Sequence, residues 1–223
     1  MAKIDIKGDI ISNGDKMIYD WLGWDSTCPT DIKSILAATP AEESVDVYIN
    51  SGGGDVLAGQ EMYAALKADK RVNIHIESLA GSAAGVVAMS GHCGMSPVAM
   101  IMIHNVSMCN ASGDYHEMQK NVSALKQMNE AMAAAYVEKS GKSLDEVLKL
   151  MDKETWLTAN QCLEYGFIDE IERNEEPNMY TNAISGQKLT DEIRQRVLSE
   201  MKEAEKLKKS KEELLNDLDM FGI

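Results

Sequence analysis

The chain has 223 residues, 44% of them hydrophobic, and carries a formal net charge of −14. This length and composition predict one sizeable core, or one domain with an appendage. The acidic balance argues against a nucleic-acid partner, because phosphate binding needs clustered Lys and Arg. No apolar run approaches the roughly 20 residues of a membrane span, so no membrane-spanning segment is expected.

The opening stretch, MAKIDIKGD, has no apolar signal-peptide segment, so we expect a cytoplasmic protein. The four cysteines are scattered, without the spacing of a metal site, and are expected to stay reduced. No metal and no cofactor are expected.

Hydrophobic patterns predict strands and helices that alternate along most of the chain. The expected elements are strands at 4–10, 45–50, 71–77, 98–104 and 167–171, and helices at 30–38, 55–68, 78–91 and 113–139 and after Ser143 and Thr158. Ser143 with Glu146, and Thr158 with Gln161, have the spacing of capping boxes. The alternation from 45 to 171 predicts an α/β fold with a mostly parallel sheet and helical crossovers.

The character of the sequence changes after about residue 174. The stretch NEEPNMYTNAISGQ is typical of a linker, and 190–218 is dense in Glu and Lys with one apolar stripe, which predicts an amphipathic helix. We therefore divide the chain into a domain at 1–173 and an extension at 174–223. The helix either packs on its own domain or a neighbour, or serves as a dedicated assembly segment.

The glycines of GGGD at 52–55 lie where a strand is expected to lead into a helix. They do not form a phosphate loop, because Gln60 and Glu61 stand where Lys and Ser or Thr would be needed. Two readings stay open: a plain tight turn, or a turn in which the N–H of Gly53 stabilises a developing oxyanion.

Ser82 opens the helix expected in the small-residue run SLAGSAAGVVAMSG. Neither GxSxG nor SxxK surrounds it, so two common serine-enzyme signatures are absent. At a helix start the hydroxyl lies in a positive field, and the N–H of Ala83 has no acceptor within the helix. Ser82 is therefore either a helix cap or a nucleophile whose oxyanion the same terminus stabilises.

A serine nucleophile needs a base, and His104 ends the apolar strand AMIMIH. Functional side chains gather at the carboxyl ends of parallel strands, so His104 and Ser82 can meet there, although a structural histidine is the other interpretation. A carboxylate that orients the imidazole is available in MDKETW, from Asp152 or Glu154.

Four ordered motifs together, YINSGGGDVLAGQEMYAAL, SLAGSAAGVVAMSG, MIHN and ETWLTANQCLEYGFIDEI, resemble the Clp proteolytic subunit family of ClpP-like serine peptidases, over about residues 4–171. The resemblance implies Ser82 as nucleophile, His104 as general base, and the N–H groups of Gly53 and Ala83 as the oxyanion hole. It also implies a crotonase-like spiral of ββα units, a handle helix at 113–139, and homo-oligomeric rings, heptameric or stacked.

This sequence departs from the family pattern at several places. Glu154 stands where the family usually has Asp, which leaves Asp152 as the alternative acid, and Gly52 replaces a common Pro. The chain starts almost at its first core strand, without the upstream segment that engages an ATP-driven unfoldase, so coupling to such an ATPase is not expected. The Lys- and Glu-rich C-terminal helix is a further difference.

In these departures the sequence resembles the bacteriophage and prophage branch of the family, the head maturation proteases. That resemblance implies an ATP-independent serine endopeptidase that cleaves a capsid or scaffold precursor inside an assembling prohead. The alternatives are a housekeeping Clp subunit that degrades unfolded proteins, a crotonase-type acyl-CoA enzyme, and a catalytically silent ring or assembly component.

Overall fold

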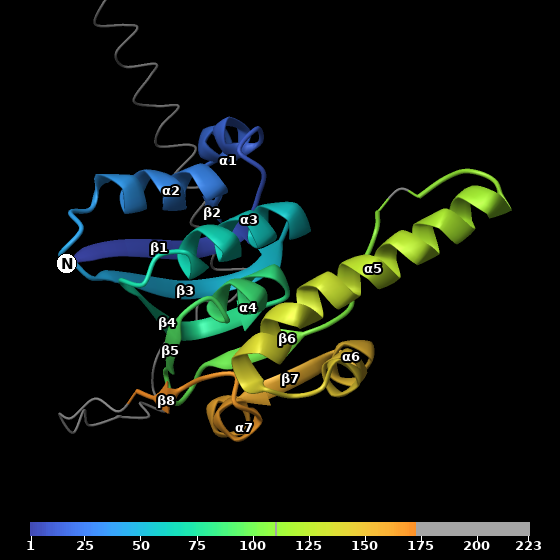
Figure 1. The fold of residues 1–223 in the computed structure, drawn as a ribbon. Helices are drawn as coiled ribbons and strands as arrows, with labels where there is room; N and C mark the ends of the chain where they lie inside the picture. Colours follow the sequence, from blue (N-terminus) through green and yellow to red (C-terminus); the bar gives the residue numbers. More distant parts are fainter. Residues whose placement is uncertain (110, 173–223) are drawn as a thin grey trace, which may run out of the picture. The chain divides into compact units, whose positions relative to one another are not determined.

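A mostly parallel β-sheet organises residues 1–109 and 111–172, which are the part of the chain described by this computed structural model (Figure 1). The strands are β1 (Ala2–Ile10), β2 (Ser26–Thr27), β3 (Val45–Gly54), β4 (Val72–Gly81), β5 (His92–Met95), β6 (Met100–Ile103), β7 (Thr155–Thr158) and β8 (Glu170–Ile171). The helices are α1 (Lys16–Leu22), α2 (Pro29–Ala38), α3 (Val56–Lys67), α4 (Ala83–Ala88), α5 (Tyr115–Ser140), α6 (Leu144–Asp152) and α7 (Ala159–Tyr165).

The expected linker and C-terminal helix at 174–223 lie outside the described residues, so the division of the chain at residue 173 stays a prediction. In the part that the structure covers, no helix combines the length and the apolar character needed to cross a lipid bilayer.

The strand order is β2-β1-β3-β4-β5-β8, and every pair along this path is parallel. β4 changes partner along its length: residues 73–76 pair with β5, and residues 79–81 pair with β6. β6 then pairs with β7 in the antiparallel direction. The predicted α/β class and mostly parallel sheet are confirmed, and the partner change in β4 places the strand that precedes His104 beside the end of β4.

Caps at the helix ends explain why several boundaries were readable from the sequence. Both predicted capping boxes form, Ser143 with Glu146 and Thr158 with Gln161, and Gly166 ends α7 in the left-handed conformation. The Asp55 side chain accepts a hydrogen bond from the N–H of Ala58 at 2.7 Å and so caps α3.

The expectation of a helix across the whole run 78–91 is wrong at its start. Leu79 to Gly81 belong to β4, because they pair with Met100 to Met102 of β6, and the helix begins only at Ala83. Four elements, α1, β2, β5 and β7, were not anticipated. α1 does carry apolar residues at helical spacing, Met17, Ile18, Trp21 and Leu22, but all four are exposed and this short segment was not predicted to be a helix.

The small residues of α4 allow this helix to pack closely against its neighbours in the core. All six of its residues are buried. A Cβ on Gly85 would lie 2.4 Å from the hydroxyl of Tyr136 in α5 and 3.1 Å from the carbonyl oxygen of Ala80. The helix at 113–139 is confirmed as α5, whose buried residues all lie in its C-terminal half, while Figure 1 shows the rest projecting away from the sheet.

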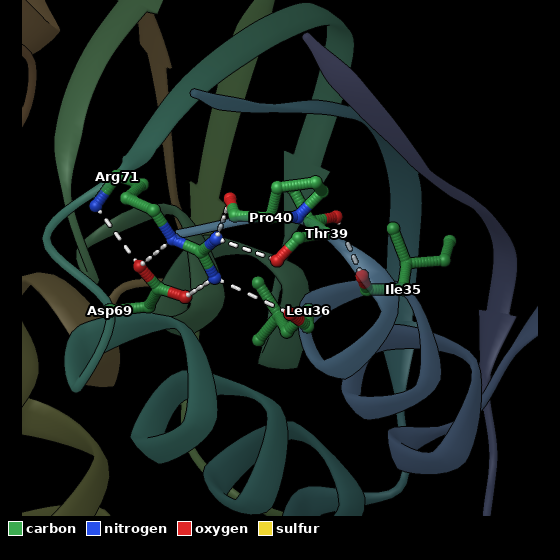
Figure 2. A network of polar contacts seen from close by, with 6 residues as sticks. All are labelled: Ile35, Leu36, Thr39, Pro40, Asp69 and Arg71. Atoms are coloured by element: carbon green, nitrogen blue, oxygen red, sulfur yellow. Dashed lines mark hydrogen bonds and ion pairs between the residues drawn. The ribbon is translucent and has the colours of Figure 1, made fainter. Parts of the chain in front are cut away.

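Arg71 anchors the start of β4 to the end of α2 (Figure 2). Its guanidinium donates hydrogen bonds to the carbonyl oxygens of Thr39 at 2.9 Å and Pro40 at 2.6 Å, and to both carboxylate oxygens of Asp69. The guanidinium in turn holds the pKa of the Asp69 carboxyl below its usual value. A positive group at a helix C-terminus also interacts favourably with the helix dipole. This contact fixes the start of β4, the strand that leads to Ser82.

Candidate active site

The turn from β4 into α4 presents Ser82 in a strained conformation. Ser82 has φ 52° and ψ −122°, and its N–H donates to the carbonyl oxygen of Met102 at 2.8 Å. Non-glycine residues in such sparsely populated regions cost about 1–3 kcal/mol and persist only where the surroundings hold them. Here the neighbouring pair, Gly81 with Met102, continues the ladder between β4 and β6 up to the turn.

His104 follows β6 directly, and its Nε2 lies 2.7 Å from Ser82 Oγ. Both residues are half-buried. A small cavity of about 20 Å³ lies beside them, lined by Val56, Ser82, Val86, Ile103, His104, Val106, Met132, Tyr136 and Met151. A serine hydroxyl within hydrogen-bond reach of an imidazole is the arrangement that lets a base take the serine proton.

The backbone of Gly53 reaches the same turn from β3. A Cβ on Gly53 would lie 2.6 Å from the carbonyl oxygen of Gly81, 2.7 Å from Ser82 Cβ and 2.9 Å from the amide nitrogen of Ala83, and its φ is +99°. Only glycine fits this approach. The N–H of Ala83 belongs to the first turn of α4, where helical N–H groups have no intrahelical acceptor. Gly53, Ser82 and Ala83 are therefore neighbours at this turn.

Ser51 is a residue at this site that sequence reasoning missed. Its Oγ accepts a hydrogen bond from the N–H of Gly53 at 3.1 Å and donates to the carbonyl oxygen of Gly8 at 2.6 Å. The hydroxyl therefore orients the peptide that precedes Gly53 and ties it to β1. The only signal in the sequence was its position in INSGGGD.

The two candidate carboxylates have hydrogen-bond partners other than His104. Asp152 accepts from Asn105 Nδ2 at 2.9 Å, and Glu154 Oε1 lies 3.4 Å from Trp156 Nε1. Within residues 1–109 and 111–172, no hydrogen bond or ion pair joins either carboxylate to His104. Glu154 has φ 47°. In this part of the chain, Ser82 and Glu154 are the only non-glycine residues at positive φ.

The other candidate nucleophiles and bases lie outside this arrangement. His92 and His116 are exposed, and His75 stacks on the ring of Tyr48. Burial raises the pKa of the Cys162 thiol to about 12, which keeps it protonated. Across the residues with described side chains, no group of three or more His, Cys, Asp or Glu side chains could hold a metal ion.

Comparison with known proteins finds matches over the part of the chain that carries this site. The family model described as Clp protease matches residues 30–175. The ATP-dependent Clp protease proteolytic subunit of Streptococcus pneumoniae (strain P1031) is 32% identical over 151 residues, which are 64% of this chain and 76% of the relative.

Two further relatives carry closely similar names. The ATP-dependent Clp protease proteolytic subunit 2 of Tropheryma whipplei (strain Twist) is 27% identical over 142 residues, 61% of this chain and 78% of the relative. The ATP-dependent Clp protease proteolytic subunit of Bacteroides fragilis (strain YCH46) is 29% identical over 133 residues, 58% of this chain and 60% of the relative, so that match covers less than two thirds of its length.

Proposed function

The chain belongs to the Clp protease family, so its enzyme class is that of the ClpP-like serine peptidases, and on this premise we propose that it is an endopeptidase whose nucleophile is Ser82. The observation that carries the proposal is the 2.7 Å contact between Ser82 Oγ and His104 Nε2. A hydratase acting on an acyl-CoA, or a silent ring component, has no use for a serine hydroxyl held against an imidazole.

In the proposed reaction, His104 Nε2 takes the proton of Ser82 Oγ as the oxygen attacks a peptide carbonyl carbon. The carbonyl π electrons move to the oxygen, which the N–H groups of Gly53 and Ala83 stabilise. The Gly53 N–H donates to Ser51 Oγ in the structure, and in the proposal it turns from Ser51 to the oxyanion. Collapse of the tetrahedral intermediate breaks the C–N bond, and His104 returns its proton to the leaving amine. A water then hydrolyses the acyl-serine by the same steps, with His104 again acting as base.

Glu154 is the proposed third member, with Asp152 as the alternative. A carboxylate at His104 Nδ1 would hold the correct tautomer and stabilise the imidazolium. The left-handed conformation of Glu154 supports this choice, because backbone strain of this kind clusters at active sites. Asp152 is already the acceptor of Asn105. In the proposal, the Glu154 carboxylate leaves Trp156 and turns to His104 when substrate binds.

Ser82→Ala tests the assignment. The variant should keep the fold, judged by circular dichroism and gel filtration, and lose most cleavage of a casein-derived fluorogenic peptide. Ser90→Ala is the matched control, because Ser90 is a buried serine at the other end of the same run. Retained cleavage by Ser82→Ala, or equal loss in Ser90→Ala, would refute the role of Ser82.

For the physiological substrate, we propose a capsid or scaffold precursor in an assembling phage prohead, cleaved without ATP in the cytoplasm by a homo-oligomeric ring. The support is the resemblance of INSGGGDV and the Lys- and Glu-rich C-terminal segment to the head maturation branch. The names of the relatives favour a second candidate, a housekeeping subunit working with an ATP-driven unfoldase.

One cleavage experiment separates the two candidates. A maturation protease should cleave a phage capsid or scaffold precursor without ATP. A housekeeping subunit should leave that precursor intact and degrade casein only when an unfoldase and ATP are added.

A further inference from the structure

A groove of about 960 Å³ adjoins the small cavity at Ser82 and His104. Val56 and Val106 line both hollows, so the two hollows lie next to each other at these residues. From there the groove extends along the carboxyl ends of β1 and β3, past Tyr19 of α1 and the middle of α5. A peptide whose scissile bond lies at Ser82 would therefore place neighbouring side chains in this groove.

The groove carries negative charge and no opposing positive charge. Asp9, Asp15 and Asp55 line it, and within residues 1–109 and 111–172 no Lys, Arg or His does. None of the three forms an ion pair within the residues whose side chains are described. Its apolar lining includes Ile11, Leu57, Met108, Leu125 and Met128.

We propose that this groove selects peptide substrates with a Lys or Arg near the scissile bond, an inference that rests on the proposed peptidase function. A long basic side chain suits the combination, because its methylenes can cover the apolar lining while its charged end reaches a carboxylate. The substrate class is thus a protein whose cleavage site includes a basic residue.

Asp9 and Asp15 are the residues that would discriminate. The Asp55 side chain is already engaged as the cap of α3, whereas Asp9 and Asp15 are exposed at the groove. Asp15 Oδ2 accepts a hydrogen bond from Ser12 Oγ at 2.8 Å, which leaves its charge facing the groove. The hydroxyl of Tyr19 lies 3.3 Å from Asp9 Oδ2 and donates to it, and desolvation and the nearby carboxylate raise the pKa of Tyr19, which keeps that proton in place. Both aspartates precede residue 30, where the family match begins, so the family comparison assigns them no role.

The test uses quenched fluorogenic peptides built on one cleaved casein sequence, with Lys or Gln placed in turn at each position around the scissile bond. At one position the Lys peptide should have about fivefold higher kcat/KM than its Gln counterpart, the size expected for two solvent-exposed charge pairs. Added salt should shrink this ratio, because exposed charges are screened.

Two matched double variants locate the effect. Asp9→Asn with Asp15→Asn should bring the Lys to Gln ratio to about one. Asp5→Asn with Asp20→Asn removes the same charge from β1 and α1 at residues that pair with Lys3 and Lys16 outside the groove, and should leave the ratio unchanged.

The inference and the peptidase proposal fail in different ways. Cleavage that depends on Ser82 but shows no Lys preference at any position, or equal loss of preference in both double variants, overturns the inference alone. If no peptidase activity is found, peptide binding can still be measured, because Ser82→Ala protein can be titrated with labelled Lys and Gln peptides by fluorescence anisotropy. Equal affinity for the two peptides would then overturn the inference.

Discussion

Replacing Gly53 with alanine should remove nearly all peptidase activity, whereas the same change at Gly52 should not. A Cβ on Gly53 would lie 2.6 Å from the carbonyl oxygen of Gly81 and 2.7 Å from Ser82 Cβ, at a φ of +99°. Relief requires the peptide of Gly53 to move away from Ser82, which would displace its N–H from the position proposed for the oxyanion. A Cβ on Gly52 meets nothing within 4 Å.

The size of the effect follows from what one oxyanion donor contributes. Loss of such a donor lowers kcat by about 10²–10³, which corresponds to about 2.7–4 kcal/mol of transition-state stabilisation. Forcing alanine into a left-handed conformation also destabilises the fold by more than about 1 kcal/mol. We therefore expect Gly53→Ala to show a lower melting temperature together with a kcat at least about 10² below wild type.

The assay is steady-state cleavage of a fluorogenic peptide by wild type, Gly52→Ala and Gly53→Ala, each checked by circular dichroism and gel filtration below its melting temperature. Gly52→Ala should remain within about twofold of wild type, since surface changes of this kind have small effects. A folded Gly53→Ala whose kcat matches that of Gly52→Ala would refute the assignment of Gly53 to the oxyanion hole.

Three further changes test the acid, the packing and the pH response. Glu154→Gln should lower kcat strongly, by up to about 10⁴ if the histidine tautomer is lost, while Asp152→Asn should cost far less. Gly85→Ala should lower the free energy of unfolding by about 1–3 kcal/mol through overpacking against the Tyr136 hydroxyl, and Tyr136→Phe in that background should recover part of the loss. Hydrogen bonds from Arg71 hold the pKa of Asp69 below its usual value, so its stabilisation is present above the unfolded-state pKa and is lost as the pH falls through the lower folded-state pKa. Acid should therefore destabilise wild type more than Asp69→Asn.

Each of these outcomes has a clear opposite. Equal activity of Glu154→Gln and wild type, with a large loss in Asp152→Asn, would move the acid to residue 152. Tyr136→Phe that adds to the defect of Gly85→Ala would contradict the proposed clash. Urea midpoints of wild type and Asp69→Asn that fall in parallel on acidification would show that the contact with Arg71 contributes no pH-dependent stability.

The contact between Ser82 and His104 was predictable because general rules connect its parts. Each residue follows an apolar strand, and parallel strands bring their carboxyl ends to one edge of the sheet. The resemblance to a peptidase family then chose the nucleophile over the helix cap, which the residues alone left open. The backbone pairing of Gly81 with Met102 is the contact that holds the two strand ends side by side.

Other features carry no readable pattern in the sequence. β7 is a four-residue strand that forms only by pairing with β6. The choice between Asp152 and Glu154 depends on side-chain reach and backbone strain, which spacing does not encode. The groove beside Ser82 combines residues 9–19, 54–57, 106–109 and 125–128, and only the fold brings these together.

The most direct test of the account is to treat the protein with a labelled fluorophosphonate and locate the adduct by mass spectrometry. An activated serine hydroxyl reacts with this probe, and the account predicts one adduct, on Ser82, whose formation slows sharply in His104→Ala. No adduct, an adduct on another serine, or undiminished labelling of Ser82 in His104→Ala would contradict it.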